Sequence, residues 1–337
     1  MKYIALIPSY EPTDKLIKIV SDLKELNKFD IIVVNDGSDK KYDKYFDKIK
    51  KDVTYLTYDE NHGKGYALKY AFKYIQKEYD ECIIATLDSD GQHTAKDTLN
   101  LCNIVNKSDD NVLLLGKRLR DKNIPFKSRF GNSLTRFIYR ISTGIDVYDT
   151  QTGLRVFKSN LLPFMIDVEG NRFEYEMNML LDAPKNKIDI KEEVIETIYE
   201  DGNSGTHFHP IKDSFRIYKQ LLKQFFKFII ASFSSFLVDY GCFALFILFM
   251  DKIYANILAR VISSIFNFTL NRNIVFKDKK NVFIAVLKYY LLAAFILLCN
   301  TLLLMLLSKV LPVLLAKVIV EIILFTISYF VQKRFIF

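Results

Sequence analysis

Four long apolar stretches in the last third of the sequence restrict the possible folds more than any other feature. They cover residues 228–250, 253–270, 289–308 and 310–331, and the charged residues within them are Asp239, Arg260, Lys317 and Glu321. A helix of about 20 apolar residues matches the ~30 Å hydrocarbon core of a bilayer. The connections are too short to hold the second layer of structure that would bury such helices in a soluble protein. The sequence therefore predicts an all-α domain with four transmembrane helices.

The basic residues are concentrated in the same region. From residue 226 onward there are twelve Lys or Arg and four Asp or Glu, a net charge of +8 that equals the formal net charge of the whole chain. The first 225 residues are therefore neutral, and we expect no nucleic-acid partner. Most cations fall at one end of the predicted spans. By the positive-inside rule we expect a multi-pass plasma-membrane protein whose N-terminal domain and both termini are cytoplasmic, with no signal peptide ahead of Tyr3–Ile7.

The predicted spans contain an internal repeat. Lys227 corresponds to Lys288 at an offset of 61 residues, and Asn271–Phe276 corresponds to Gln332–Phe337 at the same offset. Each pair repeats the same kinds of side chain at equivalent places in the predicted helices. The repeat therefore predicts two helical hairpins of equal orientation.

Charged side chains inside a bilayer are costly and seldom without a role. Asp239, Arg260 and Glu321 are expected either to hold the helices together as an internal ion pair or to form a polar seam that receives a lipid headgroup. Helices with polar seams commonly associate, so the sequence also favours a homo-oligomer.

Short apolar strands alternate with amphipathic helices over the first 200 residues. The expected strands cover residues 3–7, 31–34, 53–56 and 82–87, and the expected helices begin near residues 13, 42 and 65. Such alternation predicts an α/β domain with a mostly parallel sheet and helices on both faces. Ligands bind sheets of this kind beyond the carboxyl ends of the strands, so the loops at these ends are the candidate site.

Two carboxylates one residue apart follow the expected strand at 82–87. Asp88 and Asp90 stand where this buried strand reaches the surface, and alternate residues of an extended chain point the same way. With Gln92 as a further oxygen donor, they are suited to hold a hard cation such as Mg²⁺ or Mn²⁺. Asp-x-Asp is also common in ordinary surface turns, so the prediction of a metal site depends largely on the neighbouring loops.

Two more loops follow expected strands with useful chemistry. Asp36, before Gly37, is placed at a strand tip where its carboxylate accepts hydrogen bonds from a nucleobase or ribose. Asn61-His-Gly-Lys-Gly65 opens a helix whose free N–H groups, together with Lys64, favour an anion. These loops predict a nucleotide site beside the metal.

Seven motifs in chain order resemble those of glycosyltransferase family 2. They are Ile7-Pro-Ser-Tyr-Glu11, Val33-Val-Asn-Asp-Gly-Ser38, Asn61-His-Gly-Lys-Gly65, Leu87-Asp-Ser-Asp-Gly-Gln92, Gly116-Lys-Arg118, Ser128-Arg-Phe-Gly-Asn132 and Asp149-Thr-Gln-Thr-Gly-Leu-Arg155. The branch they resemble most is that of dolichyl-phosphate mannose synthases and bacterial undecaprenyl-phosphate glycosyltransferases. The duplicated spans resemble the GtrA-like membrane domain that often accompanies such enzymes.

The resemblance implies three parts of the chain. A GT-A domain with a Rossmann-like sheet is expected over residues 1–209, and a GtrA-like domain over residues 227–337. Between them, residues 210–226 mix lysine and arginine with aromatic and aliphatic side chains. This pattern predicts an amphipathic helix in the cytoplasmic membrane interface, with its cations toward anionic headgroups.

The implied activity is inverting transfer of a single sugar from a nucleotide-diphosphate sugar to polyprenyl (undecaprenyl or dolichyl) phosphate, for cell-envelope glycosylation. The enzyme would be a metal-dependent hexosyltransferase. Carried over by position, the residues that line the nucleotide-sugar pocket are Pro8, Tyr10, Glu11, Asp36, Lys64, Asp88 and Ser89. The metal ligands are Asp88, Asp90 and Gln92, and the residues that bind the acceptor phosphate are Arg118 and Arg129. Asp90, Arg118 and Arg129 are the expected catalytic residues.

The chain departs from the family pattern at two places. The first acidic motif reads Asn35-Asp36 where the family commonly has two carboxylates, so Asp36 alone carries that role. The segment 199–209, where mannose synthases place a basic residue near the donor diphosphate, has no Arg or Lys. His207 or His209 is expected to take this place, unless the donor differs in its sugar or nucleotide.

Two other functions share some of these sequence features. A processive polysaccharide synthase uses a Gln-x-x-Arg-Trp motif, and this chain contains no Trp. A transporter or flippase of lipid-linked sugar is favoured by the intramembrane charges and the repeat, with the other half as a sensor. The motifs leave the donor open among UDP-glucose, UDP-N-acetylglucosamine and GDP-mannose, since one hydrogen bond decides among them.

Overall fold

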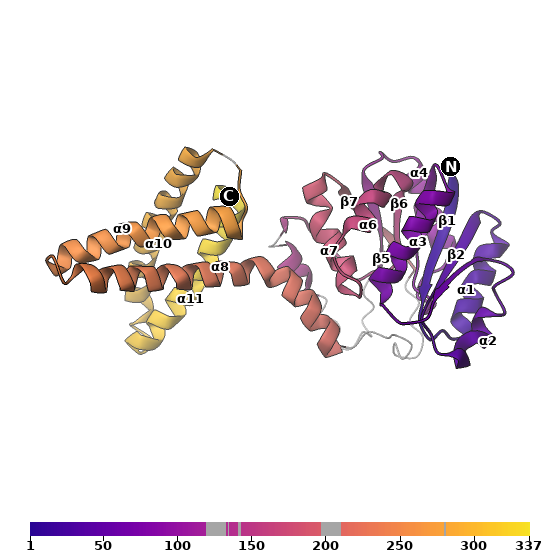
Figure 1. The fold of residues 1–337 in the computed structure, drawn as a ribbon, viewed down its shortest axis with the longest axis horizontal. Coiled ribbons are helices and arrows are strands. Elements are labelled where there is room, and N and C mark those ends of the chain that lie inside the picture. Colours follow the sequence, from indigo (N-terminus) through magenta and orange to yellow (C-terminus); the bar gives the residue numbers. More distant parts are fainter. Residues whose placement is uncertain (119–132, 134, 141–142, 197–209, 280) are drawn as a thin grey trace. The chain divides into compact units, whose positions relative to one another are not determined.

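The computed structural model describes residues 1–118, 133, 135–140, 143–196, 210–279 and 281–337, with side chains in these ranges except at 210–221. The chain divides into two compact units, Met1–Leu221 and Leu222–Phe337 (Figure 1). Helix α8 (Pro210–Phe246) begins at the start of the predicted juxtamembrane segment and continues through the first span. The predicted functional division at 209 and 226 stays a prediction.

The first unit is built on a seven-stranded sheet with the order β3-β2-β1-β4-β6-β5-β7. Strand β6 pairs antiparallel with both β4 and β5, while β1 pairs parallel with β2 and β4, β2 with β3, and β5 with β7. The strands are β1 (Lys2–Ser9), β2 (Phe29–Asp36), β3 (Thr54–Tyr58), β4 (Cys82–Thr86), β5 (Val112–Arg118), β6 (Arg155–Lys158) and β7 (Asp189–Ile195). The predicted mostly parallel α/β fold is confirmed.

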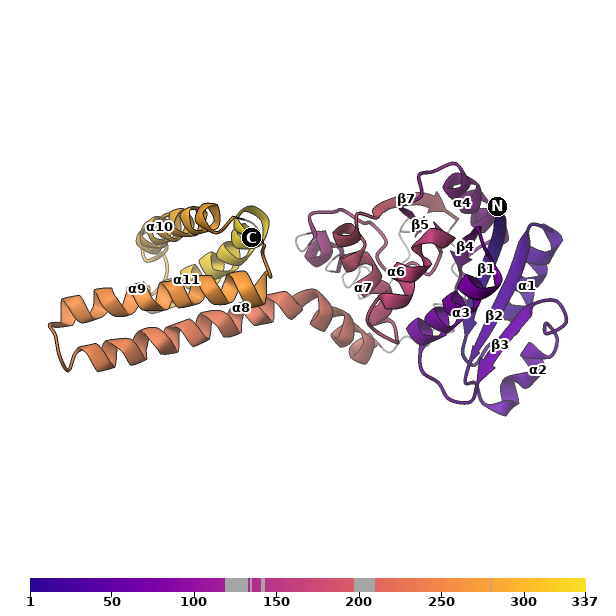
Figure 2. The same cartoon turned by 45° about the horizontal axis from the view of Figure 1, so that its top comes forward.

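Helices cover both faces of this sheet (Figure 2). One face packs against α3 (Lys64–Glu78), α6 (Leu162–Asp167) and α7 (Glu174–Asp182). The other packs against α1 (Asp14–Glu25), α2 (Asp43–Phe46) and α4 (Ala95–Asn106). The central strands are apolar at successive positions because both of their faces are buried.

Threonine hydroxyls begin two of these helices. Thr13 Oγ1 accepts a hydrogen bond from the Lys15 N–H at the start of α1, and Thr94 Oγ1 accepts one from the Asp97 N–H at the start of α4. These bonds satisfy backbone donors that have no partner in the first helical turn. The caps explain why α1 begins beside the predicted Thr13.

The second unit consists of four apolar helices long enough to cross a membrane. They are α8 from Leu222, α9 (Lys252–Leu270), α10 (Val282–Leu307) and α11 (Val313–Val331); a π-helical turn extends α9 through Val275 and another extends α11 through Ile336. Four predicted spans are thus present. The third begins at Val282 rather than at residue 289, so Lys288 lies inside it. Its ammonium donates to the Phe335 carbonyl at 3.1 Å, which gives the lysine a hydrogen-bond partner near the start of α10.

Contacts within the second unit follow the 61-residue repeat. Asn271 Nδ2 donates to Oε1 of its own counterpart, Gln332, at 3.2 Å. The rings of Phe276 and its counterpart Phe337 stack with centroids 5.1 Å apart. Two further ring pairs are equivalent under the same offset. Phe268 packs against Phe337 with centroids 5.7 Å apart, and Tyr329, the counterpart of Phe268, packs against Phe276, the counterpart of Phe337, at 6.0 Å. Equivalent residues that meet one another indicate a two-fold-like relation between the hairpins α8–α9 and α10–α11.

Candidate active site

The carboxyl ends of β1, β2 and β4 lie at one edge of the sheet, because these neighbouring strands run parallel. The loops that follow them hold the predicted residues at 8–11, 36–38 and 88–92. A fourth segment joins them, since Thr86 Oγ1 at the end of β4 donates to the Gly153 carbonyl at 2.8 Å. The predicted convergence of these loops is therefore present in the fold.

The Asp88 carboxylate is closely enclosed. Lys64 Nζ lies 2.6 Å from its Oδ1, and Nε2 of the buried His93 lies 3.6 Å from its Oδ2, beyond hydrogen-bond length. Gly153 packs against this carboxylate so closely that a Cβ there has no room. Burial by itself raises the pKa of Asp88, but Lys64 and His93 outweigh burial and hold that pKa well below its usual range. Asp88 is therefore an ionised, oriented carboxylate.

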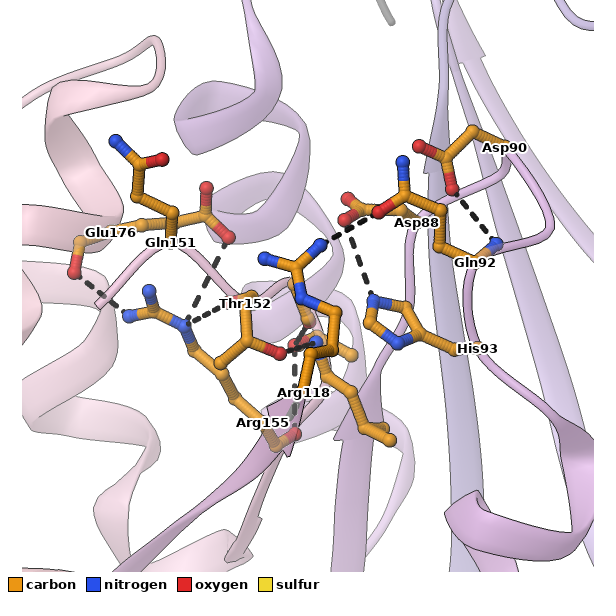
Figure 3. Close-up of polar contacts among 12 residues, drawn as sticks. Asp88, Asp90, Gln92, His93, Arg118, Gln151, Thr152, Arg155 and Glu176 are labelled. Atoms are coloured by element: carbon orange, nitrogen blue, oxygen red, sulfur yellow. Dashed lines mark hydrogen bonds and ion pairs between the residues drawn. The ribbon is translucent and has the colours of Figure 1, made fainter. Parts of the chain in front are cut away.

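Asp90 shares the loop but has a different environment (Figure 3). Its Oδ1 accepts a hydrogen bond from the Gln92 N–H at 3.1 Å, across the turn that Gly91 makes at φ +78°. Burial, followed by the charge of Asp88, raises the pKa of Asp90. A cation between the two carboxylates would favour the ionised form of Asp90.

The predicted metal ligands fit Mg²⁺ or Mn²⁺ on this chemistry. Asp88 and Asp90 supply hard oxygens, whereas Gln92 Oε1 accepts a hydrogen bond from Arg118 at 2.7 Å. Within the described residues, no group of three or more His, Cys, Asp or Glu side chains has the arrangement of a metal site. Mg²⁺ is typically bound by one or two carboxylates and completes its shell with waters and substrate phosphates. Asp88 and Asp90 match this number of carboxylates, and their role as metal ligands stays a prediction.

Arg118, at the end of β5, is held by two acceptors. Its Nε and Nη2 donate to Asp149 at 2.7 and 3.2 Å, and its Nη1 donates to Gln92 at 2.7 Å. The guanidinium is therefore fixed beside the carboxylate loop, where its positive charge attracts an anion such as a phosphate. The other predicted phosphate ligand, Arg129, and the predicted donor contact, His207, lie outside the described residues.

Asp36 is more enclosed than the sequence suggests. It is 3% exposed, and its oxygens accept hydrogen bonds from the Tyr58 hydroxyl, the Asn61 amide and the N–H groups of His62 and Gly63. These bonds shape the 61–63 loop that leads into α3. The structure thus shows Asp36 organising the loop, while its predicted role toward ribose or base stays a prediction.

The remaining predicted nucleotide-site residues lie at the same edge. Pro8 is buried, and Tyr10, Glu11 and Ser89 are half-buried. Glu11 has φ +48°, a left-handed conformation that costs a residue with a side chain about 1 kcal/mol or more. Its N–H donates to Ser38 Oγ at 2.9 Å, which ties the first loop to the second.

Sequence reasoning missed a buried chain of charges behind Asp88. Lys64 also lies 2.8 Å from Glu176 Oε1 of α7, and the fully buried Arg155 donates to the Glu176 carbonyl at 2.8 Å (Figure 3). The Asp88 and Glu176 charges overcome the effect of burial and raise the pKa of Lys64. The sequence signal was weak, because Glu176 lies far from the motif loops along the chain and inside an ordinary amphipathic helix.

Comparison with known families matches two parts of the chain. The family "Glycosyl transferase family 2" matches residues 4–164, and the family "GtrA/DPMS, transmembrane domain" matches residues 227–337. The chain carries a family 2 glycosyltransferase domain and a GtrA/DPMS transmembrane domain. The predicted family resemblance is confirmed.

Two dolichyl-phosphate transferases are among the curated relatives of this chain. The UDP-N-acetylglucosamine–dolichyl-phosphate N-acetylglucosaminyltransferase of Methanococcus voltae is 29% identical over 242 residues, which is 64% of this chain and 93% of the relative. The dolichyl-phosphate beta-glucosyltransferase of Saccharomyces cerevisiae is 24% identical over 220 residues, 56% of this chain and 64% of the relative. Mannosyl-3-phosphoglycerate synthase from Rubrobacter xylanophilus is similar in structure, with a TM-score of 0.52 at 13% identity over 66% of this chain and 74% of that one. That last likeness supports the fold alone.

The four charged residues of the predicted apolar stretches form two separate groups. Arg260 lies 3.7 Å from Asp239, which also accepts a hydrogen bond from Ser263 at 2.8 Å. In the second hairpin, Glu321 lies 2.7 Å from Lys317 and accepts a hydrogen bond from Asn300 at 2.9 Å. Each group lies within one hairpin, so Glu321 does not take part in the ion pair of Asp239 and Arg260.

Proposed function

We propose that this glycosyltransferase moves a single sugar from a nucleotide-diphosphate sugar to polyprenyl phosphate at the cytoplasmic membrane face, with inversion at the anomeric carbon. The observation that carries the proposal is the Asp88–Asp90 loop with Arg118 beside it, in a chain that also contains four membrane spans. The two relatives described above, both dolichyl-phosphate transferases, support the same acceptor class. Together these features favour a lipid phosphate over a soluble acceptor.

The proposed reaction needs no protein base. A phosphate monoester with a second pKa near ~6 is already largely ionised at neutral pH, so its oxygen is a ready nucleophile. That oxygen forms a bond to the anomeric carbon while the bond from this carbon to the diphosphate breaks, and the electron pair leaves with the nucleoside diphosphate. A single displacement of this kind inverts the configuration.

The residues then act by position and charge. Arg118, which Asp149 fixes in place, attracts the acceptor phosphate by its positive charge, together with the predicted Arg129. Asp88 and Asp90 would hold Mg²⁺ or Mn²⁺, which supplies compensation for the negative charge of the leaving diphosphate. Pro8, Tyr10, Glu11 and Asp36 belong to the loops that would enclose the nucleotide. We propose the plasma membrane as the location, with the catalytic domain and both termini cytoplasmic and with the protein as a homo-oligomer.

Purified full-length protein in detergent provides the test. Undecaprenyl phosphate or dolichyl phosphate is incubated with UDP-glucose, UDP-N-acetylglucosamine or GDP-mannose and with Mn²⁺ or Mg²⁺, and the glycolipid is followed by mass spectrometry. Asp90→Ala is expected to abolish transfer, while Asp109→Ala, at an exposed acidic residue away from the strand-end loops, is expected to leave it unchanged. Absence of transfer from every donor to either lipid would refute the proposal.

A flippase of lipid-linked sugar is the second candidate. The Asp239–Arg260 and Lys317–Glu321 pairs inside the spans favour it, because charges at such depth are costly unless they serve a path or an interface. Proteoliposomes that contain preformed polyprenyl-phosphate sugar distinguish the two activities. Translocation without any transfer supports the flippase, and transfer without translocation supports the enzyme alone.

A further inference from the structure

The Lys64 ammonium lies between two carboxylates from different parts of the fold. Its Nζ is 2.6 Å from Asp88 Oδ1 and 2.8 Å from Glu176 Oε1, and its side chain is 14% exposed. Lys64 is the first residue of α3, and the next residue, Gly65, packs against Tyr175 of α7 without space for a Cβ. The α3 start and α7 are therefore pressed together, so the position of Lys64 is fixed by the fold.

A second cation, Arg155, lies near the same Glu176 oxygen. Arg155, 1% exposed, lies with its Nε 3.9 Å from Glu176 Oε1, and its guanidinium also donates to the carbonyls of Thr150, Thr152 and Glu176. Glu176 is thus flanked by two cations, Arg155 and Lys64. Its carboxylate attracts Lys64 from the side opposite to Asp88.

This arrangement matters for a metal at Asp88. An ammonium 2.6 Å from one carboxylate oxygen competes with a divalent cation for that carboxylate and also repels the cation directly. Glu176 shares the ammonium and so reduces the competition. If Glu176 lost its charge, Lys64 would pair with Asp88 rather than share its ammonium between the two carboxylates.

We propose that Glu176 is a positioning residue, which retains Lys64 on the α7 side and so leaves the Asp88 carboxylate available to the divalent cation. The inference rests on the proposed metal-dependent transfer and adds to it an internal lysine that competes with the metal. Lys64 then acts as a built-in counter-ion that stabilises the carboxylate pair before the cation arrives. Glu176 sets how strongly Lys64 pairs with Asp88.

The test measures Mn²⁺ binding directly, from the electron paramagnetic resonance signal of free Mn²⁺ over the purified full-length protein. Glu176→Gln retains the shape but removes the charge, and we expect the Mn²⁺ dissociation constant to rise about tenfold, as stronger pairing of Lys64 with Asp88 implies. The double variant Lys64→Met/Glu176→Gln removes both charges and is expected to bind Mn²⁺ at least as tightly as the wild type. Asp110→Asn, which weakens the remote Lys158–Asp110 pair, is the matched control and should leave Mn²⁺ binding unchanged.

The outcomes separate the inference from the function. If Glu176→Gln binds Mn²⁺ like the wild type, or if the double variant binds more weakly than the single one, the inference is wrong while lipid-linked transfer stands. If the wild type binds no Mn²⁺, the inference falls together with the metal part of the proposed function. If Glu176→Gln is not recovered in folded form, Lys64→Met alone decides, because loss of the competitor should tighten Mn²⁺ binding and unchanged or weaker binding contradicts the inference.

Discussion

The Asp149→Asn substitution should weaken transfer chiefly through the acceptor. Asp149 accepts hydrogen bonds from Nε and Nη2 of Arg118 at 2.7 and 3.2 Å, and these bonds fix the guanidinium that we propose to orient the lipid phosphate. Asparagine keeps the volume and one acceptor oxygen but removes the charge. One of the two bonds is then lost, and the other loses the carboxylate charge of its acceptor while its Arg118 donor stays charged.

The size of the effect follows from these two bonds. A hydrogen bond to a charged group contributes about 1.5–3 kcal/mol, against about 1 kcal/mol between neutral groups. The Arg118 and Asp149 side chains are 19% and 10% exposed, so solvent screens the pair in part and the lower end of this range applies. A loss of about 2 kcal/mol corresponds to roughly a 30-fold lower kcat/KM. Transfer rates at fixed donor and varied polyprenyl phosphate measure it, and we expect most of the loss in the KM for the acceptor.

Asp146→Asn is a matched control, because Asp146 binds Arg136 in the same two-bond geometry at 2.8 and 2.7 Å but with side chains 40% and 32% exposed. Exposed pairs contribute about 0–1 kcal/mol, so its kcat/KM should change less than about fivefold. Equal effects of the two variants, or an unchanged acceptor KM in Asp149→Asn, would refute the role of Asp149 in orienting Arg118.

Three further predictions follow from other contacts. Gly153→Ala should displace the Asp88 carboxylate, since its Cβ has no room, and should abolish both transfer and Mn²⁺ binding while the melting temperature shows a folded protein; retention of Mn²⁺ binding would contradict this. Asn271→Leu and Gln332→Leu should each destabilise the membrane domain by about 1 kcal/mol, and the double variant by less than the sum, in denaturation from detergent; strict additivity would show that the two amides are not coupled. Burial raises the pKa of Tyr139 to about 12, so the stability that its neutral form contributes is complete below pH 10, the ordinary pKa, and is lost as pH rises toward 12. Melting temperatures between pH 9 and pH 12 should therefore fall less steeply in Tyr139→Phe than in the wild type, and equal slopes would contradict the assignment.

Much of the fold was predictable because buried elements consist of apolar residues, which are visible in the sequence. Strands β1, β2 and β4 are buried on both faces, and they stand in the sequence as short apolar runs that end in polar loops. The spans were equally visible, since a bilayer demands long apolar helices. The predicted third span begins seven residues later than α10, at residue 289, because the apolar run is interrupted by Lys288, whose ammonium donates to the Phe335 carbonyl from inside the helix.

The site was predictable only where its residues follow a strand. Asp88, Asp90 and Gln92 come directly after β4, so their place at the sheet edge was implied by the strand itself. Asp149 and Glu176 belong to segments that reach the site from elsewhere in the chain, and their sequence neighbours give no sign of Arg118 or Lys64 as partners. The enclosure of Asp36 by Tyr58 and Gly63 likewise depends on a contact between two loops.

The sequence by itself determined the two-part architecture, the family and the order of the strand-end loops, because apolar periodicity and short motifs are local properties of the chain. The tertiary structure alone decided the partners of each charge: Lys64 between Asp88 and Glu176, Arg118 on Asp149, and Asn271 on its repeat counterpart Gln332. The physical reason is distance. Hydrogen bonds and ion pairs act over a few ångströms in space, and only folding brings side chains so far apart along the chain within that reach.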